Sequence, residues 1–166
     1  MTEDLQDRAS RAPAGDDLVF AECHSPEVVC LFYRACRLPV RMFGSRPCLI
    51  TSEGCGLVSM PAELGRVVCQ RLGQPPVLLD SRWQMCSFVV VPDRRIPRSS
   101  WPQLAQLGIR TVAEGRRILL PTHGTATALV HWVSPPRPDM GPPPRTVVLR
   151  TARAGGPCEE AWPCLQ

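Results

Sequence analysis

Lysine is absent from this sequence, and all 19 of its basic residues are arginine. The planar guanidinium group of arginine binds phosphate through two parallel hydrogen bonds, so the composition suits contact with nucleic acid. A coding bias toward G and C explains the same composition more simply. The formal net charge of +4 permits an anionic partner but does not require one.

Long apolar runs are also absent, because no stretch approaches the roughly 18 residues that a membrane-spanning helix needs. The chain opens on the polar and acidic residues Met1, Thr2, Glu3 and Asp4, and no apolar core of a signal peptide follows. We therefore expect a cytoplasmic protein with no membrane contact. Nine cysteines cannot all pair within one chain, and free thiols are the expected state in that compartment.

Spacings typical of metal sites are missing. No Cys-x-x-Cys occurs, Cys23 and His24 are adjacent, and Cys158 and Cys164 lie too far apart for one zinc knuckle. No Asp-x-Asp follows an apolar strand, although two-metal phosphoryl transfer needs carboxylates that converge. Spacing therefore predicts no metal site.

Two other catalytic patterns are incomplete. The segment Gly54-Cys55-Gly56 lacks both the P-loop and the dinucleotide fingerprint, and a plain β-turn is the favoured interpretation. A Cys–His dyad is conceivable, but buried structural cysteine is the simpler interpretation, and His131 is interpreted as a half-buried packing residue in a strand. The residues alone thus show no complete catalytic site.

The length and composition indicate one folded domain. A chain of 166 residues with 44% hydrophobic residues can bury a substantial core. We expect a single α+β domain over residues 17–150, a disordered tail at 1–16 and a flexible tail at 151–166. Within the domain, residues 134–145 are rich in proline and are predicted to form an extended linker.

Capping signals and apolar periodicity place the expected elements. Ser25 as N-cap and Pro26 at the first helical position predict a helix that ends before Pro39. The apolar run at 84–91 predicts a central buried strand. The other expected elements are a strand at 17–21, a strand–turn–strand unit at 47–60, a helix at 62–73, a strand at 76–80, a short helix at 101–107, a hairpin-like pair at 117–121 and 128–133, and an edge strand at 146–149.

Four blocks of sequence follow one another in the order found in a known family. They are CLFYRACRLPV at 30–40, LITSEGCGLVSMPAE at 49–63, QMCSFVVVP at 84–92 and EGRRILLPTHGTATALVHWV at 114–133. With these blocks, residues 26–133 resemble the N-terminal prim-pol domain of bifunctional DNA primase/polymerases, and in particular its short stand-alone relatives in high-GC bacteria. The resemblance implies a mixed or antiparallel sheet flanked by helices.

The metal motif of that family is degenerate in this chain. The resemblance places the two metal-binding carboxylates of active members at Pro61 and Glu63, and the motif histidine near Cys86. Proline cannot bind a metal ion, and two-metal catalysis without its bridging carboxylate should lose most of its rate. The resemblance therefore implies a prim-pol-like domain without catalytic residues or a cofactor, in which Mg²⁺ or Mn²⁺ would matter only if the domain were active.

Binding of single-stranded nucleic acid or of a nucleotide is the leading functional hypothesis. The resemblance puts Arg110, Arg116 and Arg117 near the family's active-site face. His123 belongs to the segment that stands where the family has Pro-Pro-Ser, and it is predicted to join this binding surface. Arginine side chains there would contact phosphates, whereas arginines that are merely solvated are the alternative interpretation. A second loop is crowded with basic residues, namely Arg94, Arg95 and Arg98.

Two further functions stay open on the sequence. The proline-rich stretch 135–144 and the segment around Trp162 suit docking to a protein partner, which would make the chain an accessory protein without nucleic-acid binding. An active metal-dependent primase/polymerase with relocated ligands is the other alternative.

Overall fold

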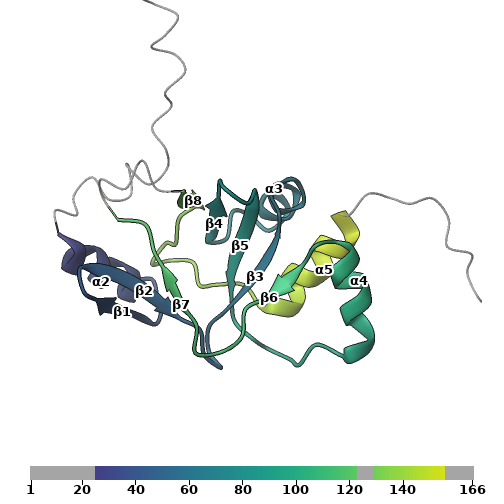
Figure 1. Cartoon of the computed structure of the whole chain (residues 1–166), viewed down its shortest axis with the longest axis horizontal. Coiled ribbons are helices and arrows are strands. Elements are labelled where there is room, and N and C mark those ends of the chain that lie inside the picture. The colour runs from purple at the N-terminus through teal and green to yellow at the C-terminus, as the bar shows by residue number, and fades with distance from the viewer. Residues whose placement is uncertain (1–24, 123–128, 156–166) are drawn as a thin grey trace, which may run out of the picture.

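The computed structural model of the protein describes residues 25–122 and 129–155. Figure 1 shows its elements in chain order. The helices are α2 (Pro26–Ala35), α3 (Ala62–Arg71), α4 (Trp101–Gln106) and α5 (Arg145–Gly155), with the 3₁₀ turn η1 (Arg98–Ser100) before α4. The strands are β1 (Val40–Phe43), β2 (Arg46–Ile50), β3 (Gly56–Pro61), β4 (Val77–Asp80), β5 (Met85–Val90), β6 (Arg110–Thr111), β7 (Arg117–Leu119) and β8 (Val130–Ser134).

The strands form two antiparallel sheets. A three-stranded sheet has the order β1-β2-β7, and a five-stranded sheet has the order β6-β3-β5-β4-β8. The predicted α+β class is therefore confirmed. None of the described helices is long and apolar enough to cross a lipid bilayer.

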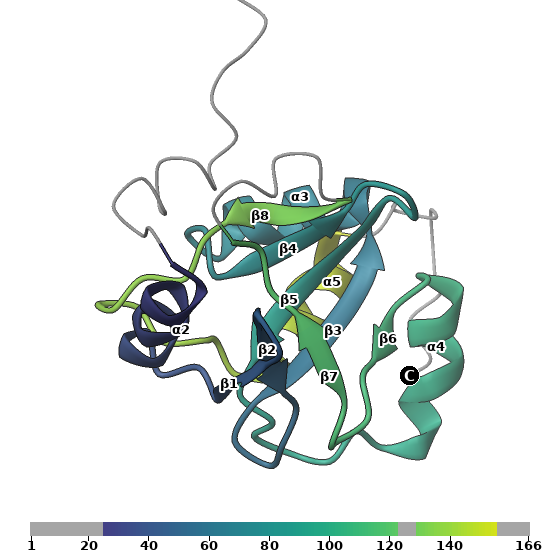
Figure 2. The ribbon, with the colours of Figure 1, turned by 60° about the vertical axis from the view of Figure 1, so that its left-hand side comes forward.

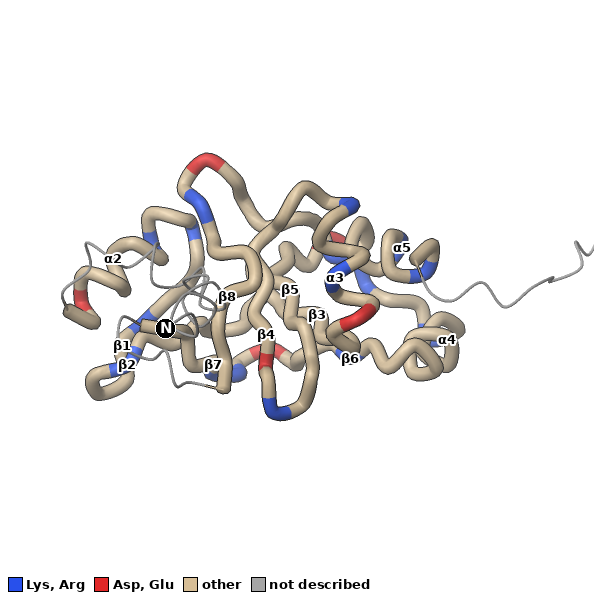
Figure 3. The backbone as a smooth tube through the Cα atoms, turned by 90° about the horizontal axis from the view of Figure 1, so that it is seen from above, with Lys and Arg blue, Asp and Glu red and all other residues tan. Residues whose placement is uncertain are grey.

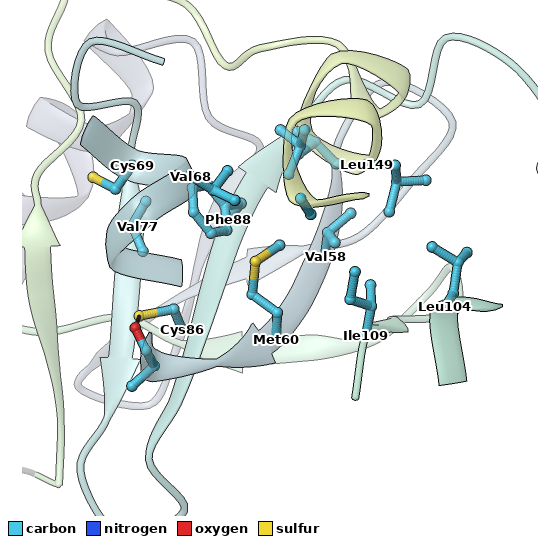
Figure 4. Close-up of a cluster of buried hydrophobic side chains, with 14 residues drawn as sticks. Val58, Met60, Val68, Cys69, Val77, Cys86, Phe88, Leu104, Ile109 and Leu149 are labelled. Carbon is cyan, nitrogen blue, oxygen red and sulfur yellow. Dashed lines mark hydrogen bonds between the residues drawn. The ribbon is translucent and has the colours of Figure 1, made fainter. Parts of the chain in front are cut away.

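The five-stranded sheet lies between two packed layers (Figure 2). Alternate residues of a strand point to opposite faces, and neighbours such as Leu57 and Val58 on β3 enter different core clusters. One face packs on α3 and α5, where Phe88 lies beside Val68 (Figure 4) in a cluster that also contains Val148. The other face packs on α2 and the three-stranded sheet, in a cluster that contains Leu57, Leu78, Val89, Trp132, Tyr33 and Leu49.

Local signals predict several elements correctly. Ser25 caps α2 by accepting a hydrogen bond from the Val28 N–H at 3.4 Å, and Pro26 is the first helical residue. The predicted helix at 62–73 is α3, which ends just before Gly73, whose φ of +71° favours glycine. The apolar run at 84–91 forms β5, the middle strand of the larger sheet, as predicted.

The strand partners differ from the sequence-based expectation. Residues 117–121 and 128–133 were expected to pair as a hairpin, but β7 pairs with β2 and β8 pairs with β4, in different sheets. Likewise β2 and β3, which flank the turn at 51–55, enter different sheets. The reason is burial, because β7 covers the edge of β2 while β8 brings Trp132 into the core at 1% exposure.

The predicted edge strand at 146–149 is wrong, since these residues belong to α5. Buried Val148, Leu149 and Ala152 recur at helical spacing and pack against α3 and the larger sheet, which overrides the β-branched composition. The proline-rich segment 134–145 is partly fixed in the fold, because the Val91 N–H donates to the Pro143 carbonyl at 2.9 Å. The flexible tail predicted at 151–166 is wrong for residues 151–155, because they belong to α5 and Ala152 is buried against the core. The predicted strand at 17–21, the tail at 1–16 and residues 156–166 lie outside the described residues.

Candidate nucleic-acid interface

The three positions that the predicted prim-pol resemblance assigns to a metal motif gather where β3 meets α3. Pro61 ends β3 opposite Met85, Glu63 is exposed in the first turn of α3, and Cys86 lies on β5 opposite Met60. A shallow depression of about 400 Å³ opens beside Pro61, and Glu63 is the one carboxylate among the described residues that line it. Over the described ranges, no group of three or more His, Cys, Asp or Glu residues is placed to hold a metal ion.

Cys86 faces the protein interior. Its thiol is 1% exposed, and its Sγ lies 4.0 Å from the Ala62 carbonyl oxygen. Gly65 of α3 packs directly on it, so that a methyl group at this glycine would lie 2.8 Å from Sγ. Burial raises the pKa of the Cys86 thiol, with a smaller contribution from Cys69, so the neutral form is favoured. Cys86 thus packs as a small apolar side chain, in agreement with the structural interpretation of the cysteines.

A second surface, on the three-stranded sheet, gathers arginine around an exposed aromatic ring. Between β1 and β2 the register pairs Arg41 with Cys48 and Phe43 with Arg46. Between β2 and β7 it pairs Cys48 with Leu119 and Ile50 with Arg117. Residues that pair directly across two strands lie on the same face of a sheet, and so does every second residue along one strand. Val40, Leu49 and Ile118 occupy the intervening positions and point into the core. We call the opposite, outward face the arginine face. Its residues are Arg41, Phe43, Arg46, Cys48, Ile50, Arg117 and Leu119.

The centre of the arginine face is a stacked pair. The guanidinium carbon of Arg117 lies 4.2 Å from the centroid of the Phe43 ring, within the range of a cation–π contact. Phe43 and Leu119 are 36% and 52% exposed, unusually open for apolar side chains in a sheet. Burial raises the pKa of the Cys48 thiol, while the positive charges of Arg117 and Arg46 lower it by a smaller amount. Both guanidinium groups therefore lie close enough to Cys48 to act on it electrostatically.

The charge of this face is not neutralised by the described parts of the chain. Arg41, Arg46 and Arg117 are all exposed, and the tube in Figure 3 shows basic positions recurring along β1, β2 and β7. Between described residues the ion-pair geometry is met once, by Arg137 and Asp139, far from this sheet in sequence. The arginine face is therefore a positively charged surface with an aromatic centre.

Thr51 positions the arginine-bearing strand β7. Its hydroxyl donates to the Ala113 carbonyl at 2.7 Å and accepts from the Arg116 N–H at 2.8 Å. Its own N–H donates to the Arg116 carbonyl at 3.0 Å, and its carbonyl accepts from the Gly115 N–H at 2.8 Å. Thr51 is 2% exposed, so one buried polar residue at the end of β2 holds the turn that leads into Arg117.

The structure separates the residues that the sequence predicted as one site. Arg117 lies on the arginine face, and Arg116 is exposed immediately before it. Arg110 lies on β6, the edge strand of the five-stranded sheet, where it pairs with Ser59 of β3. His123 lies outside the described residues. The loop arginines Arg94, Arg95 and Arg98 lie between β5 and α4, away from this sheet.

Three residues of the arginine face were missed by the sequence-based prediction, namely Arg41, Phe43 and Arg46. The signal that could have found them is the alternation Val40-Arg41-Met42-Phe43, followed by a turn at Gly44 with φ of +59°. This pattern is typical of a hairpin with one buried and one exposed face. What the sequence does not show is that β7, more than 60 residues later, adds Arg117 to the same face.

Comparison with known proteins adds no relative. No family model, no curated protein and no solved structure matches this chain. The prim-pol resemblance over residues 26–133 therefore stays a prediction from the sequence.

Proposed function

We propose that this protein binds single-stranded nucleic acid across the arginine face, on a prim-pol-like scaffold that has no polymerase activity. The observation that carries the proposal is the stack of Arg117 on the exposed Phe43 ring, with Arg41 and Arg46 on the same face. Proteins that bind single strands without strong sequence preference combine these two features, a basic surface for the backbone and aromatic platforms for the bases.

Each part of the face has a chemical role in this proposal. The guanidiniums of Arg41 and Arg46 contact phosphates through charge-assisted hydrogen bonds. A base continues the stack on the guanidinium plane of Arg117, and Leu119 offers apolar contact beside it. Arg116, directly before β7, extends the basic surface along the strand. A duplex has no unstacked bases to offer, so single strands are the preferred ligand.

The absence of polymerase activity is proposed from the residues at the family's metal positions. Pro61 offers no ligand atom, Cys86 is a buried thiol, and only Glu63 is an exposed carboxylate there. Two-metal phosphoryl transfer needs at least one carboxylate that bridges the ions. Nucleic-acid binding without chemistry, and without a Mg²⁺ or Mn²⁺ cofactor, is the function that these residues support.

Fluorescence anisotropy of a labelled oligothymidylate, titrated at several salt concentrations, tests the proposal. The double variant Arg46→Ala/Arg117→Ala should weaken binding, because it removes one phosphate contact and the stacking surface for a base. The slope of log K against log salt should flatten by about 0.7, the change that one lost phosphate contact on a single strand produces. The matched control is Arg66→Ala/Arg71→Ala on α3, which removes two exposed arginines elsewhere. It should retain most of the wild-type affinity.

Two results would contradict the proposal. The first is no binding by the wild-type protein even at low salt. Coding bias would then be sufficient to explain the arginine content. The second is equal loss of affinity in the two double variants, since this would mean that only the net charge matters.

A further inference from the structure

A groove of about 530 Å³ lies between α5 and the segment that leads into η1. In Figure 1, α5 is at the other end of the molecule from the three-stranded sheet. Three of its lining residues are arginines. Arg95 comes from the segment before η1, while Arg150 and Arg153 are three residues apart on α5 and therefore share one side of the helix. Among the described residues, no carboxylate forms an ion pair with any of the three.

The floor of this groove is apolar. Leu149 is only 8% exposed and Ile96 is half-buried, and both pack into the core cluster under α5. The hydroxyl of Ser100 adds one polar group to the lining. A groove with cations at its rim and an apolar floor matches a ligand that joins an anionic group to an apolar or aromatic body, and its volume falls in the usual range for small-molecule sites.

Hydrogen bonds hold the two walls of the groove together. Asp93 accepts from the Thr146 N–H at 3.1 Å and from the Thr146 hydroxyl, and this hydroxyl contact lowers the pKa of the Asp93 carboxyl. The Arg145 N–H donates to the Val91 carbonyl at 2.9 Å, and its guanidinium donates to the Arg94 carbonyl. Asp93 is thus engaged with the first turn of α5, and the spacing between Arg95 and α5 is set before any ligand binds.

We propose that this groove is a nucleotide site, in which Arg95, Arg150 and Arg153 bind the phosphates and the base lies on Ile96 and Leu149. Three like charges held around one groove repel one another, and a polyphosphate relieves this repulsion while it forms bidentate hydrogen bonds. The flat base covers the apolar floor. None of the described residues that line the groove is a carboxylate, so in this proposal the arginines alone balance the charge of the phosphates.

This site is independent of the arginine face. The arginine face lies on β1, β2 and β7, whereas the groove is lined by α5 and residues 95–100. In Figure 1 the three-stranded sheet and α5 lie at opposite ends of the molecule. It is also distinct from the depression beside Glu63, which is lined by other residues. Either proposal can therefore fail alone.

The test is titration of the full chain with a fluorescent N-methylanthraniloyl derivative of ATP, in the presence of EDTA. Wild-type protein should bind, and Arg150→Ala/Arg153→Ala should weaken binding by about tenfold or more, because each variant position loses a charge-assisted hydrogen bond. Alanine is a good helix former at these exposed positions, so α5 should persist, which circular dichroism checks. The matched control Arg66→Ala/Arg71→Ala should bind as wild type does.

A second measurement tests the apolar floor. Ile96→Ser should weaken binding of the fluorescent nucleotide, whereas inorganic tripolyphosphate should compete equally well against wild type and this variant. No binding by wild-type protein, or equal weakening in Arg150→Ala/Arg153→Ala and Arg66→Ala/Arg71→Ala, would overturn the site. If tripolyphosphate competes as tightly as unlabelled ATP, the assignment of a nucleotide is overturned as well, since the base would contribute nothing.

Discussion

The hydroxyl group of Tyr33 accepts a hydrogen bond from Trp132 Nε1 at 2.8 Å. The same hydroxyl donates to the Pro121 carbonyl at 2.7 Å, so one atom joins α2, β8 and the segment that follows β7. The two rings are tilted by 49° with centroids 6.0 Å apart, and both side chains are at most 1% exposed. This contact connects the layer that carries the arginine face to the edge strand of the larger sheet.

Replacement of Tyr33 by Phe should therefore destabilise the fold. The variant keeps the ring but loses two buried hydrogen bonds, at a cost of about 1–3 kcal/mol in the free energy of unfolding. Urea unfolding followed by tryptophan fluorescence measures it. Leu31→Ala, on the same helix but 61% exposed, is the control and should change stability far less. Equal effects of the two variants would show that the hydroxyl has no special role.

Gly65 should be intolerant of a side chain. A methyl group there would lie 2.4 Å from the Cβ of Cys86, whose strand is at the centre of the larger sheet. Gly65→Ala should cost about 1–3 kcal/mol through overpacking, despite the better helix propensity of alanine. Gly54→Ala is the control, because nothing lies within 4 Å of its added Cβ. Thermal unfolding of the two variants should differ in midpoint, and coinciding midpoints would refute the packing argument.

Phe43 should matter for binding through its ring. Phe43→Ala should weaken oligothymidylate binding by about 1–3 kcal/mol, the usual contribution of base stacking on an aromatic side chain. Phe43→Trp should bind at least as well as wild type, since it keeps an aromatic surface under Arg117. The measurement is anisotropy at one low salt concentration. Loss of binding in the Trp variant as well would point to a structural role of the phenylalanine.

No template-dependent dNTP incorporation is expected in the presence of Mn²⁺ or Mg²⁺. The reason is that Pro61 cannot supply the carboxylate that two-metal catalysis requires. A primer-extension assay checks this, with Glu63→Ala run beside the wild type. Incorporation by the wild type that disappears in Glu63→Ala would show instead an active polymerase with relocated ligands.

Stability should fall in alkaline solution because of buried thiols. Burial raises the pKa of the Cys55 thiol from its ordinary value of 9.0 to about 11. The unfolded chain loses this proton first, so the stability present below pH 9 is lost progressively as the pH rises toward 11. One pKa unit corresponds to about 1.4 kcal/mol, so Cys55→Ala should shrink that loss by on the order of 2–3 kcal/mol. Urea unfolding of both proteins at pH 9 and pH 11 measures the difference, and an unchanged difference would rule Cys55 out.

Part of the candidate binding surface could be predicted from the sequence. Arg116 and Arg117 were predicted to bind nucleic acid, and Arg117 does lie on the arginine face. Arg110 was grouped with them because it is close in the chain, yet β6 pairs with β3 and carries it to the other sheet. Arg95 was identified only as part of a basic loop. Its partners on α5 could not be found, because residues 146–149 have a β-branched composition and were expected to form a strand.

The sequence by itself determined the elements whose signals are local. The Ser25 cap, the turn at Gly73 and the apolar run of β5 act over a few residues, so neighbours in the chain are enough to specify them. Only the tertiary structure decided which strands pair, that α5 is a helix, and which arginines share a surface. These outcomes depend on the burial of apolar faces between segments far apart in the chain, such as β2 with β7 and α3 with α5, and no local pattern encodes that choice.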